Sequence, residues 1–351
     1  MLIKLDSSIV ELNRNYEDEE IYAIQKLINL VRKRYHLIYS KYEVLEKLSK
    51  IEDLGCRDRK IFEKLATRIR QKFNFYEKNF KKRLLIYIDT PKEKKSKNDI
   101  QIELKDFDKI DETKTNFLVE GKDITFFDFI VNFHFENFNK KIAYNYINTY
   151  DEITGGGNTT ADNFRKLKKN KIVICVCDSD RDYKNCRLGD TAKKIKKVKI
   201  LCHEIAHLMI LEEKAIENLI PRVIYNPILE NKSDFLDKLE KEKEFEYIKH
   251  LDFKKGMKKK RFLECKEYKK FWKLKIEEFF KEELDKKLDD LDEESCVIEK
   301  VSENLLNSVN KRIETGKINI EYSSLSDYHK KRWQEIAEEL ICWFICETNP
   351  I

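Results

Sequence analysis

The segment Ile172–Cys177 (IVICVC) is the feature that most constrains the fold of this chain. All six residues are apolar, and most of them are β-branched. A continuous apolar run of this length is typical of a strand that is buried on both faces, as in a parallel sheet covered by helices. The run ends at Asp178. It therefore predicts an α/β domain with a carboxylate at one edge of the sheet.

Further short strands and helices are predicted on both sides of this run. The expected strands are Asn116–Glu120 (NFLVE), Ile142–Ile147 and His207–Leu211 (HLMIL), the expected helices are Thr125–Phe138, Thr160–Lys169 and Thr191–Lys197, and a loop is expected at Asp151–Asn158. The aromatic residues of Phe126–Phe138 are expected to form the buried face of the first crossover helix. Strands that alternate with short helices predict βαβ units and a parallel sheet.

The two flanks of this region carry helical periodicity instead. Apolar residues recur at spacings of three and four in five segments, which are Glu19–Lys50, Arg57–Phe80, Ser233–Leu251, Lys260–Asp290 and Asp327–Cys346. A short strand is expected at Leu84–Asp89. We therefore predict an α/β chain with a helical N-terminal region (residues 1–112), a parallel-sheet catalytic domain (113–232) and a helical C-terminal region (233–351).

The composition of the chain indicates the cellular compartment in which it is expected. No apolar run is long enough to span a membrane, and the first residues show no export signal. Nine cysteines are present, but none forms a C-x-x-C pair, so neither structural zinc nor a redox dithiol is indicated. The expected location is the cytoplasm, with reduced thiols and no membrane partner.

Charge points to a polyanionic substrate. The net charge of +6 is the small difference between 71 basic and 65 acidic side chains. Basic clusters occur at Arg165–Lys171, Lys193–Lys199 and Lys254–Arg261. Each one alone is typical of a solvated helix face, but two clusters flank the acidic residues described next, and together they favour a nucleic acid partner, DNA or RNA.

Two of the predicted strands end in carboxylates. Glu120 closes NFLVE, and Asp178 follows IVICVC, with Asp180 and Asp182 after it. If the two strands are neighbours, these side chains converge at the carboxyl edge of the sheet, where sites form in open parallel sheets. Carboxylate oxygens are the ligands that Mg²⁺ prefers, and Mn²⁺ suits the same oxygen ligands. We therefore predict a Mg²⁺ or Mn²⁺ site.

Other residues near these acids are candidates for binding substrate. Lys122, Arg181 and Lys184 either hold substrate phosphates or neutralise the carboxylates. The loop Gly155–Gly157 either cradles a phosphate at a helix N-terminus or forms a plain turn.

The motifs Val119–Asp123 (VEGKD) and Asp178–Asp180 (DSD), each closing an apolar strand, resemble the TOPRIM domain. That domain occurs in topoisomerases, primases and the OLD-type nucleases with their relatives in phage defence. The resemblance covers about 105 residues, and it implies metal-binding or catalytic roles for Glu120, Asp178 and Asp180, with Asp182 as a further ligand. Gly121 and Asp123 would support the site.

The resemblance also extends to Ile216–Pro221 (IENLIP), which is similar to a segment that follows the TOPRIM core in some defence proteins. It implies a supporting role for Glu217. The chain has no zinc-finger or polymerase motifs, so the resemblance favours a nuclease effector of antiphage defence. Because no Walker A sequence occurs, ATP hydrolysis would come from a separate ATPase or sensor protein. A homodimer is also compatible with the flanking helices.

A competing motif is His203-Glu204-Ile205-Ala206-His207, which matches HExxH. On a helix the two histidines would bind Zn²⁺ and Glu204 would polarise the attacking water, as in zinc metallopeptidases. Glu230 is a candidate third ligand. Against this alternative, the predicted strand His207–Leu211 would separate His203 from His207. A further alternative is a non-catalytic subunit whose long helices dimerise and dock a partner.

Overall fold

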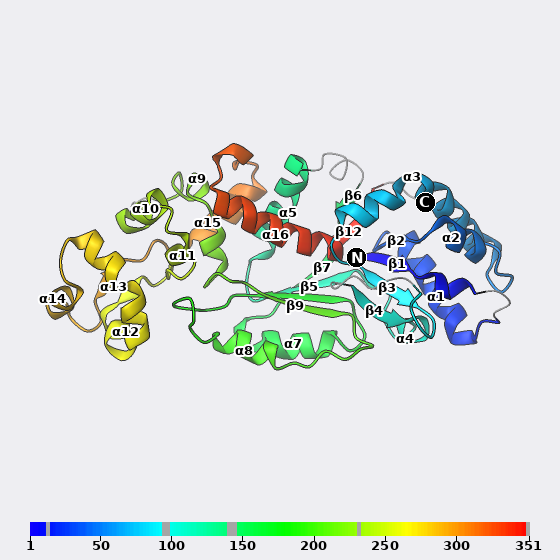
Figure 1. The fold of residues 1–351 in the computed structure, drawn as a ribbon, viewed down its shortest axis with the longest axis horizontal. Helices are drawn as coiled ribbons and strands as arrows, with labels where there is room; N and C mark the ends of the chain where they lie inside the picture. Colours follow the sequence, from blue (N-terminus) through cyan, green and yellow to red (C-terminus); the bar gives the residue numbers. More distant parts are fainter. Residues whose placement is uncertain (12–14, 93–98, 139–145, 230–232, 349–351) are drawn as a thin grey trace.

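The computed structural model of the chain is a mixed α/β protein in which helices flank two parallel sheets. It describes residues 1–11, 15–92, 99–138, 146–229 and 233–348. The molecule is elongated, with the N-terminal sheet towards one end, the second sheet near the middle and the helices of residues 259–289 at the other end (Figure 1). The predicted α/β class is therefore confirmed.

The central sheet contains the strands that the acidic residues follow. Its four strands are all parallel, in the order β7-β5-β8-β9. Their bounds are β5 (Thr115–Val119), β7 (Tyr150–Thr154), β8 (Val173–Cys177) and β9 (Ala206–Ile210). Three of these strands were predicted. The fourth, β7, lies in the segment that was predicted to be a loop, because its sequence YDEIT is polar and only half-buried at an edge.

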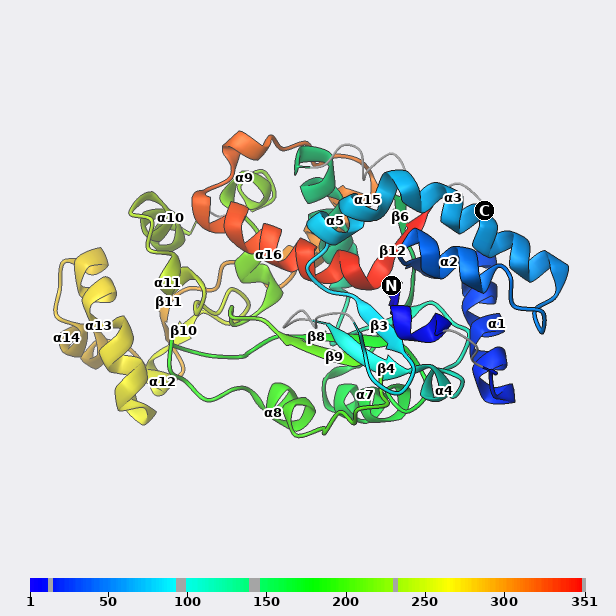
Figure 2. The ribbon, with the colours of Figure 1, turned by 45° about the vertical axis from the view of Figure 1, so that its right-hand side comes forward.

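Helices cover both faces of this sheet. Leu118, Val173 and Cys175 pack against α7 (Thr160–Leu167) and α8 (Asp190–Lys196), whereas alternate residues such as Phe117 and Ile174 face the main core. On that second face lie α5 (Ile124–Phe138) and α16 (Asp327–Phe344), which pack against each other. Figure 2 shows α7 and α8 on one side of the strands and α16 on the other. The aromatic residues of α5 are largely buried, as predicted.

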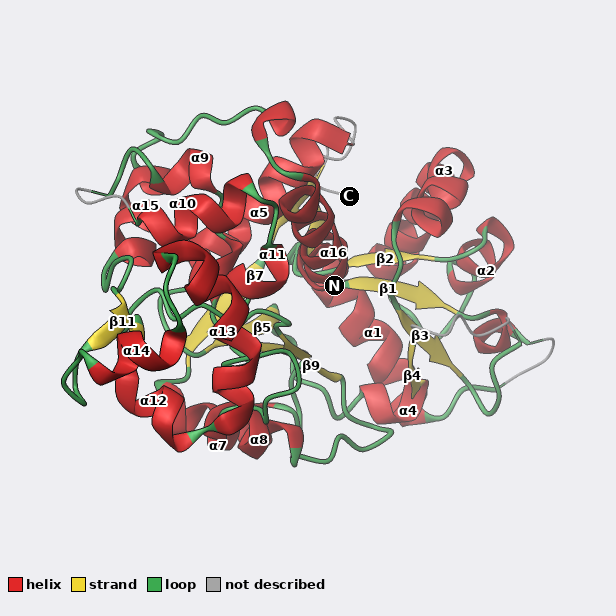
Figure 3. Ribbon diagram, turned by 60° about the vertical axis from the view of Figure 1, so that its left-hand side comes forward, coloured by secondary structure: helices red, strands yellow, loops and turns green. Residues whose placement is uncertain are grey.

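Residues 1–112 form a second α/β unit, and the predicted helical region is wrong in this respect. Four parallel strands lie in the order β2-β1-β3-β4 (Figure 3). They are β1 (Leu2–Leu5), β2 (Leu37–Tyr39), β3 (Leu84–Tyr87) and β4 (Ile100–Glu103). The helices of the unit are η1 (Ser7–Val10), α1 (Asp18–Arg32), α2 (Tyr42–Leu48), α3 (Cys56–Asn79) and α4 (Leu104–Phe107).

Two predicted helices of this unit have different outcomes. The helix expected at Arg57–Phe80 is confirmed by α3. The one expected at Glu19–Lys50 is interrupted, because the buried strand β2 separates α1 from α2. The short strand expected at Leu84–Asp89 is β3.

Two short helices, η3 (Ile216–Leu219) and α9 (Arg222–Tyr225), follow the central sheet. The C-terminal region after them is mainly helical, as predicted. Its helices before α16 are α10 (Asp234–Lys241), α11 (Phe245–Ile248), α12 (Lys259–Glu264), α13 (Lys266–Phe280), α14 (Leu284–Asp289), α15 (Leu305–Glu314) and η4 (Tyr322–Ser324). Two short strands, β10 (Met257–Lys258) and β11 (Cys296–Ile298), pair antiparallel between them.

The last helix, α16, connects the parts of the molecule. Its buried residues include Trp333, Leu340 and Phe344, and they belong to the same core as both parallel sheets. Directly after it, β12 (Ile345–Glu347) pairs antiparallel with β6 (Tyr146–Asn148). The strand predicted at Ile142–Ile147 overlaps β6, and its first four residues lie outside the described part.

All nine cysteines are free thiols. Within the described residues, no helix has both the length and the apolar composition to cross a bilayer.

Candidate active site

Glu120 and Asp178 follow the two central strands of the middle sheet. Strands β5 and β8 are hydrogen-bonded neighbours, with Val119 opposite Val176. From β5 the chain crosses to β7 on one side, and then returns to β8 on the other side. The carboxyl ends of β5 and β8 are therefore the topological switch point, which is where open α/β sheets bind their ligands.

The glycine-rich loop after β7 packs onto the end of β5. The Gly155 N–H donates to the Val119 carbonyl at 2.6 Å, and the Gly156 N–H donates to the Glu120 carbonyl at 3.0 Å. A Cβ atom on Gly155 would overlap the side chain of Thr160, so this close approach requires glycine. Two of the N–H groups that a phosphate cradle would use are thus already donors. The loop positions Glu120 rather than cradling a phosphate through these two groups.

Asp178 is connected to the segment that carries Glu217. The Asp178 carboxylate accepts a hydrogen bond of 3.0 Å from the Ile216 N–H, at the start of η3. Asn218 fixes the same turn, since its side-chain amide donates to the Ile248 and Leu251 carbonyls. Glu217, which is 2% exposed, is thereby held beside the ends of the central strands.

Asp180 adopts a strained backbone conformation at the rim of the site. Its φ of 52° lies in the left-handed region, and its N–H donates to the Lys214 carbonyl at 2.9 Å. Gly189 lies directly against its side chain, where a Cβ atom would overlap the Asp180 carboxylate. The Gly189 N–H in turn donates to the Ser179 carbonyl at 2.9 Å. These contacts keep Asp180 on the same edge of the sheet as Asp178.

Five carboxylates of this edge form one acidic cluster, which consists of Glu120, Asp123, Asp178, Asp180 and Glu217. Burial raises the pKa of Glu120 to about 7, and the charges of Asp180 and Asp123 add to the effect. Burial and the charge of Glu217 raise the pKa of Asp123 to about 6. The pKa of Asp178 is raised well above its usual range by burial and by repulsion from the other four. Such mutual repulsion is typical of functional sites.

Two buried oxygens of the acidic cluster have no hydrogen-bond donor in the part of the chain that the structure describes. Among the described residues, Glu120 Oε1 and Glu217 Oε2 are buried without a hydrogen-bond partner. An unpaired buried carboxylate oxygen is costly, and a cation is the partner that would satisfy it. The donor set is therefore of the type that suits Mg²⁺ or Mn²⁺.

The cluster is not arranged as a complete metal site. Within the described part of the chain, no three His, Cys, Asp or Glu side chains form a group that could hold a metal ion. To ligate one ion, the side chains of Glu120, Asp178 and Asp180 would have to rotate towards a common point. Of these three side chains Asp180 is exposed, whereas Glu120 and Asp178 are half-buried.

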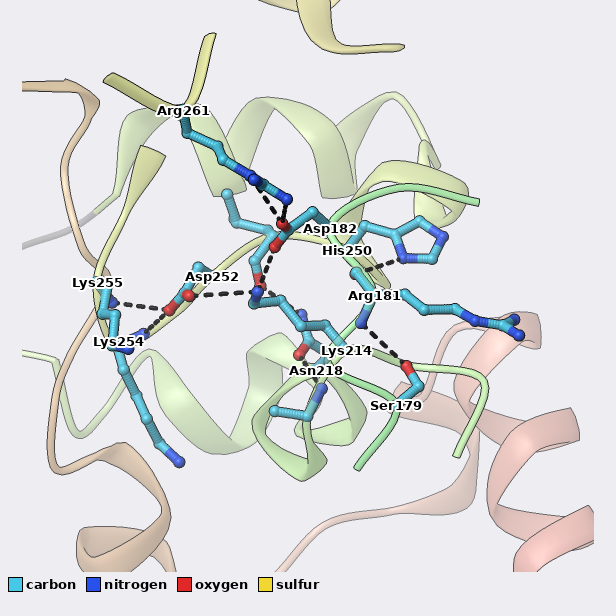
Figure 4. A network of polar contacts seen from close by, with 12 residues as sticks. Ser179, Arg181, Asp182, Lys214, Asn218, His250, Asp252, Lys254, Lys255 and Arg261 are labelled. Atoms are coloured by element: carbon cyan, nitrogen blue, oxygen red, sulfur yellow. Dashed lines mark hydrogen bonds and ion pairs between the residues drawn. The ribbon is translucent and has the colours of Figure 1, made fainter. Parts of the chain in front are cut away.

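Asp182 does not belong to the acidic cluster, and the structure does not bear out its predicted role as a metal ligand. Its carboxylate accepts from Lys214 at 2.6 Å and from Arg261 at 3.0 and 2.5 Å (Figure 4). Although burial opposes the change, the charges of Lys214 and Arg261 lower the pKa of Asp182. The residue thus fixes the loop after β8 to the C-terminal region.

Lys254 is the residue of this site that sequence reasoning missed. Its ammonium group lies 2.8 Å from Glu217 Oε1. Burial alone would lower the pKa of Lys254, but the hydrogen bond that it donates to Glu217 and the negative charges of Glu217, Asp178 and Asp123 raise it. In the sequence it belonged to the cluster Lys254–Arg261, and no local signal connected it with Glu120 or Asp178.

The three predicted substrate-binding cations lie around the site in different settings. Lys122 is exposed, and its backbone carbonyl accepts from Asn310 at 2.6 Å. The guanidinium of Arg181 points away from the Asp182 network (Figure 4), and its Nε is buried with no partner among the described residues. Lys184 lies 3.6 Å from Glu246 instead. Of the three, Arg181 has the clearest unused donor.

The HExxH motif does not form a helix, which removes the geometry that the zinc alternative requires. His203 lies in a turn and His207 lies in strand β9. Glu204 is buried and binds Lys168 through both oxygens, at 2.5 and 2.6 Å. Glu204 is therefore part of a structural ion pair. Glu230, the candidate third ligand, lies outside the described residues.

His207 has partners of its own in the structure. Its Nε2 lies 3.2 Å from Lys82 Nζ and 3.1 Å from Glu339, and its ring stacks on Trp343. These contacts join β9 to α16 and to the N-terminal unit.

Comparison with family models, with curated proteins and with solved structures finds no match to this chain.

Proposed function

We propose that this protein is a nuclease that hydrolyses nucleic-acid phosphodiesters with the help of Mg²⁺ or Mn²⁺ bound at the acidic cluster. The observation that supports this most directly is the meeting of Glu120 and Asp178 at the switch point of the central sheet, with Asp180 and Glu217 beside them. A purely structural role does not account for several carboxylates that repel one another at a partly buried edge. The resemblance of the two motifs to TOPRIM nucleases supports the same chemistry.

In this proposal three residues of the acidic cluster take part directly in the reaction. A bound divalent cation would supply charge neutralisation at the scissile phosphate and lower the pKa of an attacking water. Asp178 and Asp180 would hold the cation. Glu120, whose pKa of about 7 lets it exchange a proton near neutral pH, would accept the proton of the water. Lys254, released from Glu217, and Arg181 would bind non-bridging phosphate oxygens.

The wider role that we propose is a cytoplasmic effector in antiphage defence that acts with a separate ATPase or sensor. It rests on the motif resemblance. The zinc-peptidase alternative is not proposed, because Glu204 is committed to Lys168. A non-catalytic docking subunit is the remaining alternative, and it predicts that variants of the acidic cluster keep full function in cells.

The test is cleavage of mixed DNA and RNA substrates in Mg²⁺ and in Mn²⁺. Asp178→Ala should abolish cleavage, whereas Asp190→Asn, which alters an exposed carboxylate at the start of α8, should retain it. Equal cleavage by wild type and Asp178→Ala would contradict the proposal.

A further inference from the structure

Helices α7 and α8 carry a second charged surface, at their C-terminal ends. Its members are exposed lysines on the two helices and on the residues that follow them, and we call them the basic face: Lys166, Lys169, Lys196, Lys197 and Lys199. The two helices pack against each other on the same face of the central sheet. Figure 1 shows both of them along one side of the molecule, below the strands.

The topology of the central sheet determines where the basic face lies relative to the acidic cluster. Both helices connect one parallel strand to the next, so both run opposite to the strands. Each begins at the carboxyl edge of the sheet. There α8 follows Gly189, which contacts Asp180, and α7 follows the glycine loop that binds the end of β5. The basic face therefore lies at the far ends of two helices that both start beside the acidic cluster.

Within the described part of the chain, the lysines of the basic face have no carboxylate partners. Among the residues that the structure describes, none of the five ammonium groups takes part in an ion pair, whereas Lys193 pairs with Asp190 at 3.3 Å and Arg165 pairs with Asp162. A helix C-terminus does favour a cation, by about 0.3–1 kcal/mol. One or two lysines would satisfy both helix ends, so this effect does not explain five unpaired charges on adjoining helices.

We propose that the basic face binds the phosphate backbone of the nucleic acid whose scissile bond lies at the acidic cluster. This inference rests on the proposed function. A helix of eight residues, the length of α7, spans about 12 Å, and successive base pairs rise about 3.4 Å. The contacted phosphates are then roughly three to four base pairs from the cleaved bond. Because the face offers only ammonium groups, it contributes affinity without base specificity.

The experiment measures binding, so it does not depend on catalysis. Fluorescence anisotropy with labelled duplex DNA and single-stranded RNA is recorded in EDTA, over salt from about 50 to 200 mM. The test variant combines Lys166→Gln, Lys169→Gln, Lys196→Gln and Lys197→Gln. Its matched control combines four exposed lysines of α2 and α3 that also lack ion pairs among the described residues, namely Lys47→Gln, Lys60→Gln, Lys64→Gln and Lys78→Gln.

The expected result is weaker binding by the test variant at every salt concentration. The plot of the log of the association constant against log salt has a negative slope, and its magnitude should fall by about 1 per lysine, or about 4 in all. The control should keep the wild-type slope. Equal slopes for the test and control variants overturn the inference. Anionic lipid vesicles serve as a second polyanionic probe, and a wild type that binds these vesicles but binds neither the DNA nor the RNA also overturns it. If the slopes are equal while Asp178→Ala still abolishes cleavage, the proposed role of the basic face is wrong and the proposed function stands.

Discussion

Replacing Glu120 with glutamine should stabilise the metal-free protein near neutral pH and above, but not in mild acid. The pKa of Glu120 is raised from its usual 4.5 to about 7, first by burial and then by the charges of Asp180 and Asp123. One pKa unit corresponds to about 1.4 kcal/mol, so the ionised carboxylate costs at most about 3.5 kcal/mol. Because the side chain is partly exposed, solvent screening reduces this to about 2 kcal/mol.

The pH at which this difference appears follows from the sign of the shift. Below pH 4.5 the carboxyl group is protonated in both the folded and the unfolded chain, so ionisation costs nothing. Between 4.5 and about 7 the unfolded chain releases the proton first, and the free energy of unfolding falls as pH rises. Above about 7 the full cost is present in the wild type and absent in Glu120→Gln.

Urea unfolding in EDTA, at about pH 5 and about pH 8, measures this difference. The matched control is Glu152→Gln, an exposed glutamate on the neighbouring strand β7, which should show no such pH-dependent gain. If Glu120→Gln is no more stable than wild type at the higher pH, burial and the neighbouring carboxylates do not destabilise the ionised Glu120 side chain as described.

Three further predictions follow from the same contacts. Saturating Mn²⁺, at about 100 times its dissociation constant, should raise the free energy of unfolding of the wild type by about 2.7 kcal/mol; an equal rise in Asp178→Ala would contradict a site at the acidic cluster. Glu204→Ala should cost about 3–5 kcal/mol because it leaves the buried ammonium of Lys168 unpaired, and the double variant Glu204→Leu/Lys168→Met should recover most of this in urea unfolding; no recovery would argue against the ion pair. Gly189→Ala should reduce cleavage and lower the thermal unfolding temperature, because the added Cβ atom would overlap both the Cβ atom and the carboxylate of Asp180 and displace that side chain; unchanged cleavage would show that Asp180 is not needed.

The sequence was informative where apolar runs are continuous. Strands β5 and β8 are buried on both faces; every residue of β8 is apolar, and β5 ends in the apolar run Phe117–Val119. Strands β1 and β2 are three or four residues long. Leu37 and Ile38 of β2 also fit the spacing of the preceding helix, and Lys4 places a charge in the buried strand β1. Short strands of this kind are recognised by their partners in the sheet, which a single sequence does not show.

The residues of the site that directly follow strands could be predicted from the sequence, whereas those that reach it through tertiary contacts could not. Glu120 and Asp178 could be paired because the carboxyl ends of parallel strands share an edge. Asp182 does not join the acidic cluster because it forms ion pairs with Lys214 and Arg261. Lys254 reaches the cluster through its ion pair with Glu217. Partners so far apart in sequence are brought together only by tertiary packing. The HExxH spacing gives no zinc site for a related reason, since β9 pairs with β8 and the extended strand excludes the helix that the motif requires.

Metal-dependent cleavage is the measurement that tests the central claim most directly. Wild type, Asp178→Ala and Asp190→Asn are incubated with DNA and with RNA in Mg²⁺, in Mn²⁺ and in EDTA. The account predicts cleavage by wild type and Asp190→Asn in either metal, no cleavage in EDTA, and none by Asp178→Ala under any condition. Cleavage by Asp178→Ala at the wild-type rate, or wild-type cleavage that persists in EDTA, would contradict it.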